Sequence, residues 1–341
     1  MGLKTRVAIN GFGRIGRTVC KRIQSHPEME VVAINDIAKA ETLSHLLKYD
    51  SIHGIYDADI RFRESATLQD QPIITIDGAD VVVFNASSIQ NIPWHTCQPD
   101  IVLECTGKFK TTSELQQHLD QGAKKVILAA PPEDDSIPMV VLGVNDDLLE
   151  SDPNILSNAS CTTNNAAPMI QLIDELCGVA QAYITTIHSY TSDQSLHDQP
   201  HRDLRRARAA SQSIIPTTTG AAKALTKIFP ELSSVIGGCG IRVPVPNGSL
   251  TDITFNVKKD TSIAAVNEAF QKAAETRYKG ILQYTELPLV SIDMIGNTHS
   301  CVFDAQMTSV IGKMVKIIGW YDNEMGYSSR LIDLILRISK K

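Results

Sequence analysis

A chain of 341 residues exceeds the usual size of one hydrophobic core, so its length predicts two domains. Its content of 43% hydrophobic and 21% charged residues is typical of a soluble globular protein. The net charge of −6 argues against a broad nucleic-acid-binding surface, and no apolar run is long enough to span a membrane.

The seven cysteines are odd in number and show no CxxC spacing. They argue against a disulfide framework and a structural zinc site, and they predict a reducing, cytoplasmic location. The first predicted strand begins close to the N-terminus and leaves no room for a secretory signal. The histidines show no metal-ligand spacing, so no metal site is expected.

The N-terminal segment opens with the apolar, β-branched run Thr5–Asn10, which predicts a buried parallel strand. The glycine-rich turn Gly11-Phe12-Gly13-Arg14-Ile15-Gly16 follows at once. A helix over 17–24 and a second strand over 31–35 come next, and that strand leads directly into Asp36.

This order of strand, glycine turn, helix, strand and acid is typical of a dinucleotide-binding unit, with a plain βα turn as the alternative. The glycines allow a tight bend, backbone approach to a pyrophosphate, and close contact between helix and strand. The helix N-terminus offers free amides to the phosphates. Asp36 can accept hydrogen bonds from the adenosine ribose and would repel a 2′-phosphate, so it favours NAD over NADP.

The rest of the first half alternates predicted strands and helices, which indicates an α/β, Rossmann-type parallel sheet with helices on both faces. Candidate strands are 81–84, 101–105 and 125–128, and a helix is expected over 112–121. Ligand loops should lie at the carboxyl ends of the strands, where Gly11, Asp36 and Thr106 occur.

The pattern changes after Asn158, where a helix is expected from Cys161 to about residue 176. Longer strand-like segments follow over 182–188, 241–243, 249–258 and 313–321. They predict a second, catalytic domain of α+β type on a mostly antiparallel sheet. The charged segment 193–208 has no clean period and is expected to be a loop. A last helix, 324–339, should pack on the first domain, which gives predicted domains of 1–158 with 324–341, and 159–323.

Cys161 is flanked by hydroxyl and small polar side chains, which suits a nucleophile better than a packing residue. The predicted helix that it opens would favour its thiolate through the helix dipole. His188, in the following strand-like segment, can take the thiol proton. A buried cysteine and an unrelated histidine are the alternative for these two residues alone.

Several runs are long enough to compare with known families: residues 8–17, 46–51, 157–164, 203–210, 218–224, 242–244 and 320–328. In these runs the chain closely resembles the phosphorylating glyceraldehyde-3-phosphate dehydrogenases, and the resemblance extends over essentially the whole chain. It implies an enzyme of glycolysis and gluconeogenesis that oxidises glyceraldehyde 3-phosphate with NAD and inorganic phosphate through a cysteine thioester. It also implies a cytoplasmic homotetramer, in which the 193–208 loop reaches the cofactor site of a neighbouring subunit.

The resemblance also implies roles for individual residues. Cys161 would be the nucleophile and His188 the acid–base residue. Cofactor contacts are implied for Gly11, Gly13, Arg14, Ile15, Gly16, Asp36, Thr106 and Asn323, the last one at the nicotinamide carboxamide. Phosphate contacts are implied for Ser160, Thr162, Thr191, Arg206, Thr219, Gly220 and Arg242. Thr191 and Arg242, with Asp193, would hold the substrate's phosphate, and the others would place the attacking phosphate. Arg205 and Arg208 are alternatives to Arg206.

Some positions depart from the family pattern. Asn165 stands where many members have a second cysteine, so an intramolecular disulfide with the nucleophile is excluded. Ala129 replaces a frequent serine near the nicotinamide, and Gln199 replaces a frequent leucine in the 193–208 loop.

Two runs, 210–213 and 284–289, look more like erythrose-4-phosphate dehydrogenase, a sister enzyme that typically hydrolyses its thioester. That enzyme is the main alternative, but Thr191 and the 219–223 run keep the glyceraldehyde-3-phosphate form. A cysteine hydrolase is a further alternative, which leaves the glycine turn and Asp36 unexplained.

Overall fold

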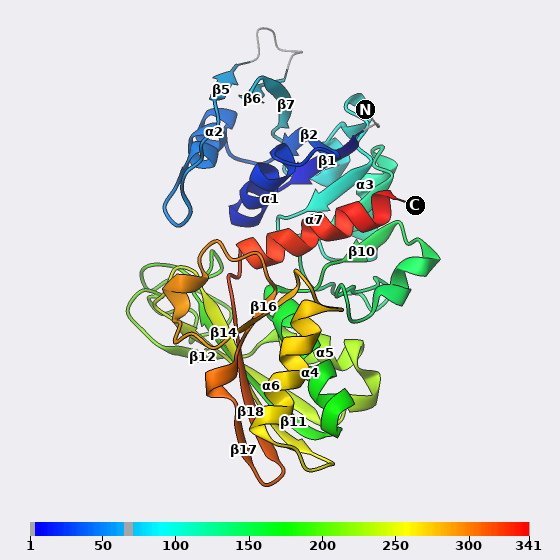
Figure 1. Cartoon of the computed structure of the whole chain (residues 1–341). Helices are drawn as coiled ribbons and strands as arrows, with labels where there is room; N and C mark the ends of the chain where they lie inside the picture. The colour runs from blue at the N-terminus through cyan, green and yellow to red at the C-terminus, as the bar shows by residue number, and fades with distance from the viewer. Residues whose placement is uncertain (1–3, 65–70, 341) are drawn as a thin grey trace. The chain divides into compact units, whose positions relative to one another are not determined.

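The computed structural model describes residues 4–64 and 71–340, and the chain divides into two units (Figure 1). Unit 1 comprises the residues up to Val140, Asp147–Ala159, and the residues from Ser328 onward. Unit 2 comprises Val141–Asp146 and Ser160–Tyr327. The short segment Val141–Asp146, inside the range predicted for the first domain, therefore belongs to unit 2.

Unit 1 is built on a mostly parallel sheet, as predicted. Its strands, in spatial order, are β10 (Ile155–Ser157), β9 (Lys125–Leu128), β8 (Ile101–Glu104), β1 (Thr5–Asn10), β2 (Met29–Asn35), β7 (Ala79–Phe84), β6 (Ile73–Ile76) and β5 (Ile60–Arg63). The pairs from β10 to β7 are parallel. Four consecutive residues of β1 are buried, because a central parallel strand is covered on both faces.

One edge of this sheet differs from the expected pattern, because β5, β6 and β7 pair antiparallel. The turn between β6 and β7 is Asp77-Gly78, and both residues have a positive φ. An Asp-Gly pair between apolar runs is a strong hairpin signal, so this pairing could have been predicted from the sequence.

The helices of unit 1 are connected to its strands in the order expected of βαβ units. Helix α1 (Arg14–Gln24) begins at Arg14 rather than at residue 17, because Gly13 already serves as its N-cap with extended backbone. It lies beside β1 and β2 (Figure 1). The other elements are α2 (Ala40–Lys48), β3 (Tyr49–Asp50), β4 (Gly54–Ile55), η1 (Ile89–Asn91), η2 (Trp94–Thr96) and α3 (Thr112–Asp120).

Two further elements contain residues of both units. They are η3 (Asp146–Ser151) and the last helix, α7 (Met325–Ser339).

Unit 2 is built on a mostly antiparallel sheet, as predicted. In spatial order its strands are β12 (Ile215–Thr217), β13 (Ile236–Val243), β11 (Val179–Ser189), β14 (Ser249–Val257), β18 (Met314–Tyr321), β16 (Cys301–Asp304) and β15 (Leu282–Thr285), and β17 (Ser309–Ile311) also pairs with β18. The β11–β13 and β15–β16 pairs are parallel.

Helix α4 (Cys161–Cys177) packs against β11, β14, β16 and β18, with α5 (Gly220–Ile228) and α6 (Ile263–Glu275) on either side of it (Figure 1). The remaining elements of unit 2 are η4 (Pro230–Leu232), η5 (Ser291–Met294) and η6 (Ala305–Met307). Between β11 and β12 the chain forms neither helix nor strand, as expected for the segment 193–208.

Candidate active site

The glycine-rich turn of unit 1 has the geometry that a dinucleotide needs. Gly11 has a φ of +92°, and a Cβ added there would lie 2.7 Å from the backbone nitrogen of Thr106. A Cβ on Gly16 would lie 2.3 Å from the carbonyl oxygen of Gly11. At Gly13 a Cβ would meet nothing within 4 Å, so the chain is open on that side. The turn can therefore admit a pyrophosphate at Gly13, whereas Gly11 and Gly16 allow tight packing.

The first turn of a helix such as α1 directs backbone amides toward its N-terminus, where they suit an anion. No side chain caps this helix, whose N-cap is Gly13. The Arg14 guanidinium instead donates to Asp50 at 2.8 Å, so Arg14 and Ile15 would contribute to a phosphate site through their amides.

Asp36 follows β2 and keeps its carboxylate beside the turn. Its Oδ2 accepts from the amide of Phe12 at 2.7 Å and its Oδ1 from the amide of Ala38 at 2.9 Å. Asp36 is only partly buried, and a carboxylate has about four acceptor positions. It can therefore still accept from ribose hydroxyls, and the residues present fit NAD.

Cys161 is the first residue of α4 in unit 2. Ser160 caps this helix, because its Oγ accepts from the amide of Thr163 at 3.1 Å. Ala159 has a φ of +55°, a conformation that costs energy in a residue with a Cβ. The Sγ atom of Cys161 lies 3.4 Å from Nε2 of His188. The predicted pairing of these two side chains is therefore present in the structure.

His188 lies near the end of β11 with 5% of its surface exposed. Its Nδ1 lies 2.8 Å from the carbonyl oxygen of Ser189. A carbonyl oxygen only accepts, whereas Nη1 of Arg242, 3.1 Å from the same Nδ1, only donates. The shorter contact with Ser189 favours a ring proton on Nδ1, which leaves a lone pair on Nε2 toward Cys161. This tautomer is the one that a base for the thiol requires.

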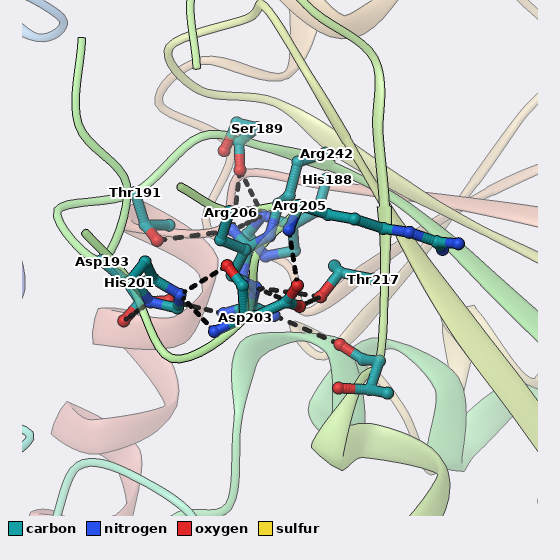
Figure 2. Close-up of polar contacts among 11 residues, drawn as sticks. His188, Ser189, Thr191, Asp193, His201, Asp203, Arg205, Arg206, Thr217 and Arg242 are labelled. Carbon is teal, nitrogen blue, oxygen red and sulfur yellow. Dashed lines mark hydrogen bonds and ion pairs between the residues drawn. The ribbon is translucent and has the colours of Figure 1, made fainter. Parts of the chain in front are cut away.

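Arg242 lies beside His188 because β11 and β13 are parallel and pair these two residues in register. Its Nη1 donates to the carbonyl oxygen of Ser189 at 2.9 Å and to Oγ1 of Thr191 at 3.4 Å. The same nitrogen lies 3.1 Å from Nδ1 of His188. Thr191, Arg242 and His188 are thus joined by one set of contacts (Figure 2). Cys161 joins the set through Nε2 of His188.

The electrostatic environment holds the imidazole neutral. Burial, and then the positive charge of Arg242, lower the pKa of His188 from 6.5 to about 3. Burial raises the pKa of the Cys161 thiol, and the Arg242 guanidinium opposes that increase. The guanidinium therefore favours a thiolate and disfavours an imidazolium, so His188 is neutral and its Nε2 lone pair faces the thiol.

Arg206 forms a second cationic centre (Figure 2). It donates from Nη1 to Oδ2 of Asp193 at 2.5 Å, from Nε to Oγ1 of Thr217 at 3.0 Å, and from Nη2 to the carbonyl oxygen of Thr218 at 3.2 Å. Although burial acts in the opposite direction, Arg206 holds the pKa of Asp193 below its usual value. Of the three candidate arginines, Arg206 is the one bonded to the segment that precedes α5.

The other predicted phosphate residues are distributed as follows. Thr219 is the N-cap of α5, where its Oγ1 accepts from the amide of Ala221 at 3.2 Å, and Gly220 is the first residue of that helix. The buried Thr162 hydroxyl lies 2.9 Å from the phenol oxygen of Tyr321, so its side chain is turned toward the protein interior. Arg205 and Arg208 are exposed, and Arg208 pairs with Asp198.

Asn323 is held in one orientation by two serines. Its Oδ1 accepts from Oγ of Ser189 and from Oγ of Ser249, each at 2.9 Å. The amide NH2 is therefore left to donate, which suits the carbonyl oxygen of a carboxamide.

Sequence reasoning missed three supporting residues, Ser189, Ser249 and Tyr321. The Tyr321 ring packs edge-on against His188 with ring centroids 5.9 Å apart, and its hydroxyl also lies 2.9 Å from Oγ1 of Thr186. Tyr321 could have been identified from the sequence, because it lies in the same matching run, 320–328, as Asn323.

Residues 4–64 and 71–340 contain no group of three or more His, Cys, Asp or Glu side chains placed to hold a metal ion. No helix in this part of the chain is long and apolar enough to cross a membrane. All seven cysteines lie within it, and each is a free thiol.

Models of known protein families match segments of both units. Residues 5–112 match the family model described as glyceraldehyde 3-phosphate dehydrogenase, NAD binding domain, and residues 160–323 match the model of the C-terminal domain. The chain is 46% identical to glyceraldehyde-3-phosphate dehydrogenase 2 of Bacillus subtilis (strain 168), over 99% of this chain and 98% of that protein. It is 46% identical to glyceraldehyde-3-phosphate dehydrogenase of Geobacillus stearothermophilus, over 99% of each.

Proposed function

Because this chain belongs to the glyceraldehyde-3-phosphate dehydrogenase family, we propose that it oxidises glyceraldehyde 3-phosphate with NAD and inorganic phosphate to 1,3-bisphosphoglycerate. The observation that supports this most strongly is the convergence of the Cys161 thiol, the neutral His188 imidazole and the Arg242 guanidinium. It combines a nucleophile, a base and an anion-binding group, which are the groups that a phosphorylated aldehyde requires.

The first step is substrate capture. The substrate's phosphate binds Arg242 and Thr191, whose side chains lie 3.4 Å apart. Nε2 of His188 takes the proton of Cys161, and the thiolate sulfur attacks the aldehyde carbon. The proton then passes from His188 to the new alkoxide, which gives a thiohemiacetal on Cys161. The Cys161 amide, at the start of α4, is a donor for the developing oxyanion.

Oxidation and release follow on the same sulfur. NAD, when bound, supplies the hydride acceptor. His188 removes the hydroxyl proton as the hydride leaves the carbon, which produces a thioester on Cys161. A phosphate oxygen then attacks the thioester carbon and the thiolate leaves, so the acyl group ends on phosphate. Arg206, with the start of α5 at Thr219 and Gly220, is the proposed site for that phosphate.

The experiment that tests this proposal follows NADH with and without inorganic phosphate. Without phosphate, glyceraldehyde 3-phosphate should give a burst of about one NADH per active thiol and then slow turnover, because the thioester accumulates. Adding phosphate should restore steady turnover. Sustained turnover without phosphate, together with faster oxidation of erythrose 4-phosphate, would instead identify the sister enzyme, erythrose-4-phosphate dehydrogenase.

We also propose that the protein is a cytoplasmic homotetramer. The segment between β11 and β12 is long, irregular and charged, and Leu196 and Leu204 on it are 62% and 82% exposed. A connection of this length is unusual for a segment that packs only within its own chain, and closed symmetric assemblies are the usual form of soluble homo-oligomers. Light scattering should give a mass close to four chains of 37.3 kDa. A mass of one chain at micromolar concentration would contradict the proposal.

A further inference from the structure

A chain of side-chain hydrogen bonds in unit 1, buried except at Thr106, is used by none of the steps above, and the carboxylate of Glu104 is its centre. Glu104 is the last residue of β8 and is fully buried. Its Oε1 accepts from the amide of Thr106 at 2.8 Å and from the Thr106 hydroxyl. Its Oε2 accepts from Nδ2 of Asn10 at 2.5 Å and from Nε2 of His118 at 3.1 Å. Four donors thus surround one carboxylate.

On one side the chain continues across the sheet. Oδ1 of Asn10, at the end of β1, accepts from Nδ2 of Asn35 at 2.7 Å. Asn35 ends β2 and is bonded to both backbone groups of Ala86, just after β7, at 2.9 and 3.0 Å. Because β8, β1, β2 and β7 are neighbours in this order, the hydrogen bonds connect the carboxyl ends of four consecutive strands. We call the six residues Trp94, His118, Glu104, Asn10, Asn35 and Thr106 the polar belt.

On the other side the belt ends in the hydrophobic core. Nε1 of Trp94 donates to Nδ1 of His118 at 2.9 Å, and both residues are fully buried. An indole nitrogen can only donate, so Nδ1 of His118 is the acceptor and Nε2 holds the ring proton. Trp94 therefore fixes the tautomer in which His118 donates to Glu104.

The belt lies directly beneath the positions that fit NAD. Asn10 precedes Gly11, Asn35 precedes Asp36, and Glu104 accepts from both the amide and the hydroxyl of Thr106. The Thr106 backbone is also the part of the chain that leaves no room for a Cβ on Gly11. In an open α/β sheet, ligands bind outside the carboxyl ends of the strands. The polar belt therefore fixes the loops at Gly11, Asp36 and Thr106 in their positions relative to one another.

A purely structural role does not require this arrangement. Burying a carboxylate costs free energy, and an apolar core of the same volume is often as stable. A fully bonded carboxylate instead fixes the geometry of the groups around it. It also turns the hydroxyl proton of Thr106 toward Glu104, while the amide of Lys108 donates to the same oxygen at 3.1 Å. Thr106 thus offers a ligand an acceptor and no hydroxyl donor, which suits a ribose hydroxyl better than a phosphate oxygen.

We propose that the polar belt is a positioning device for NAD, in which Glu104 fixes the loops at Gly11, Asp36 and Thr106 before the cofactor binds. Glu104 touches no reacting atom, so it acts as a positioning residue. Preorganised loops lose less conformational freedom on binding, and the benefit appears in cofactor affinity. The inference rests on the use of NAD in the proposed function.

The test is NAD binding by titration calorimetry on the full chain. In Glu104→Gln the side-chain amide donates where the carboxylate accepted, so it faces two of the four donors. We expect the Kd for NAD to rise at least tenfold, whereas kcat at saturating NAD stays within about twofold. The matched control is Ile74→Ala on β6, which leaves a cavity in the same sheet without removing a belt hydrogen bond. It should lower Tm while leaving the Kd within twofold.

Rescue separates positioning from general damage. Asn10→Asp alone sets two carboxylates against each other and should weaken NAD binding strongly. Combined with Glu104→Gln it restores one donor–acceptor pair, and the double variant should bind NAD more tightly than Asn10→Asp. If Glu104→Gln does not fold, Trp94→Phe removes only the outermost bond and should raise the Kd about threefold.

An unchanged Kd for NAD in folded Glu104→Gln or Trp94→Phe would overturn the inference. So would a Kd that rises in Ile74→Ala as much as in Glu104→Gln for the same fall in Tm, because NAD affinity would then depend on stability alone. Failure of the native chain to bind NAD would contradict the proposed function instead, so the two failures are distinguishable.

Discussion

Replacing Arg242 tests whether one guanidinium serves both substrate binding and proton transfer. Its Nη1 lies 3.4 Å from Oγ1 of Thr191 and 3.1 Å from Nδ1 of His188. A hydrogen bond to a charged group is worth roughly 1.5–3 kcal/mol, and about 1.4 kcal/mol is a tenfold change in an equilibrium. We expect Arg242→Ala to lower kcat/KM for glyceraldehyde 3-phosphate roughly 10- to 150-fold. The loss for unphosphorylated glyceraldehyde should be much smaller.

Arg242→Lys separates charge from geometry, because lysine keeps the positive charge but lacks the planar fork of donors. In Arg242→Ala the pKa of His188 should rise toward 6.5, since a nearby positive charge is lost. The pKa of Cys161 should also rise, because the guanidinium no longer favours the thiolate. Arg242→Lys should keep both values near those of the native chain. The pH dependence of Cys161 alkylation by iodoacetamide reports these changes.

The control is Arg277→Ala, which breaks an exposed ion pair with Glu175 at 2.8 Å in the same unit. It should change neither kcat/KM nor the alkylation profile. An Arg242→Ala protein that loses the same factor with both aldehydes would refute the reasoning, because Arg242 would then support the site as a whole. Full recovery of kcat/KM in Arg242→Lys would refute the role of its planar fork.

Three further predictions concern the other main residues. Cys161→Ser should abolish dehydrogenase activity while NAD still binds by calorimetry, and substantial residual turnover would refute its role as nucleophile. The native chain should show a higher kcat/KM with NAD than with NADP, and Asp36→Ser should shift this ratio toward NADP. If the native ratio already favours NADP, Asp36 does not decide cofactor choice. His188 must gain a proton on unfolding below pH 6.5, because its pKa in the folded chain is about 3. Stability should therefore fall as pH decreases from 6.5 toward 3, by about 2 kcal/mol at pH 5. Urea unfolding as a function of pH measures this loss, and an equally steep fall in His188→Gln would assign it to other groups.

Much of the fold followed from local patterns in the sequence. The apolar run Thr5–Asn10 and the glycines after it predict a strand and a dinucleotide turn, because each depends on a few neighbouring residues. The signal for the helix that begins at Cys161 is equally local, because serine, here Ser160, is a favoured N-cap residue. The Asp77-Gly78 hairpin also depends only on neighbouring residues, but it was not predicted.

The polar belt could not be predicted, because its members come from separate elements. Trp94, His118 and Glu104 belong to η2, α3 and β8, and their hydrogen bonds form only when the tertiary fold brings these three elements together. A lone buried histidine or glutamate gives no signal of its partner. The same is true of Ser189 and Ser249, whose common contact with Asn323 depends on the pairing of β11 with β14.

The contact between His188 and Arg242 depends on one parallel pair in a mostly antiparallel sheet. Had β13 run antiparallel to β11, its carboxyl end would lie at the opposite edge, away from Ser189 and Thr191. Because the two strands run in the same direction, His188 and Arg242 are neighbours near the ends of both. The chain then leaves β11 through Ser189 and Thr191, so both residues meet the guanidinium. The strand direction therefore places the proposed phosphate site next to the base. By this geometry, an anion bound at Arg242 would offset the charge that disfavours an imidazolium at His188. Substrate binding would thereby make His188 a better base when the thiol must lose its proton.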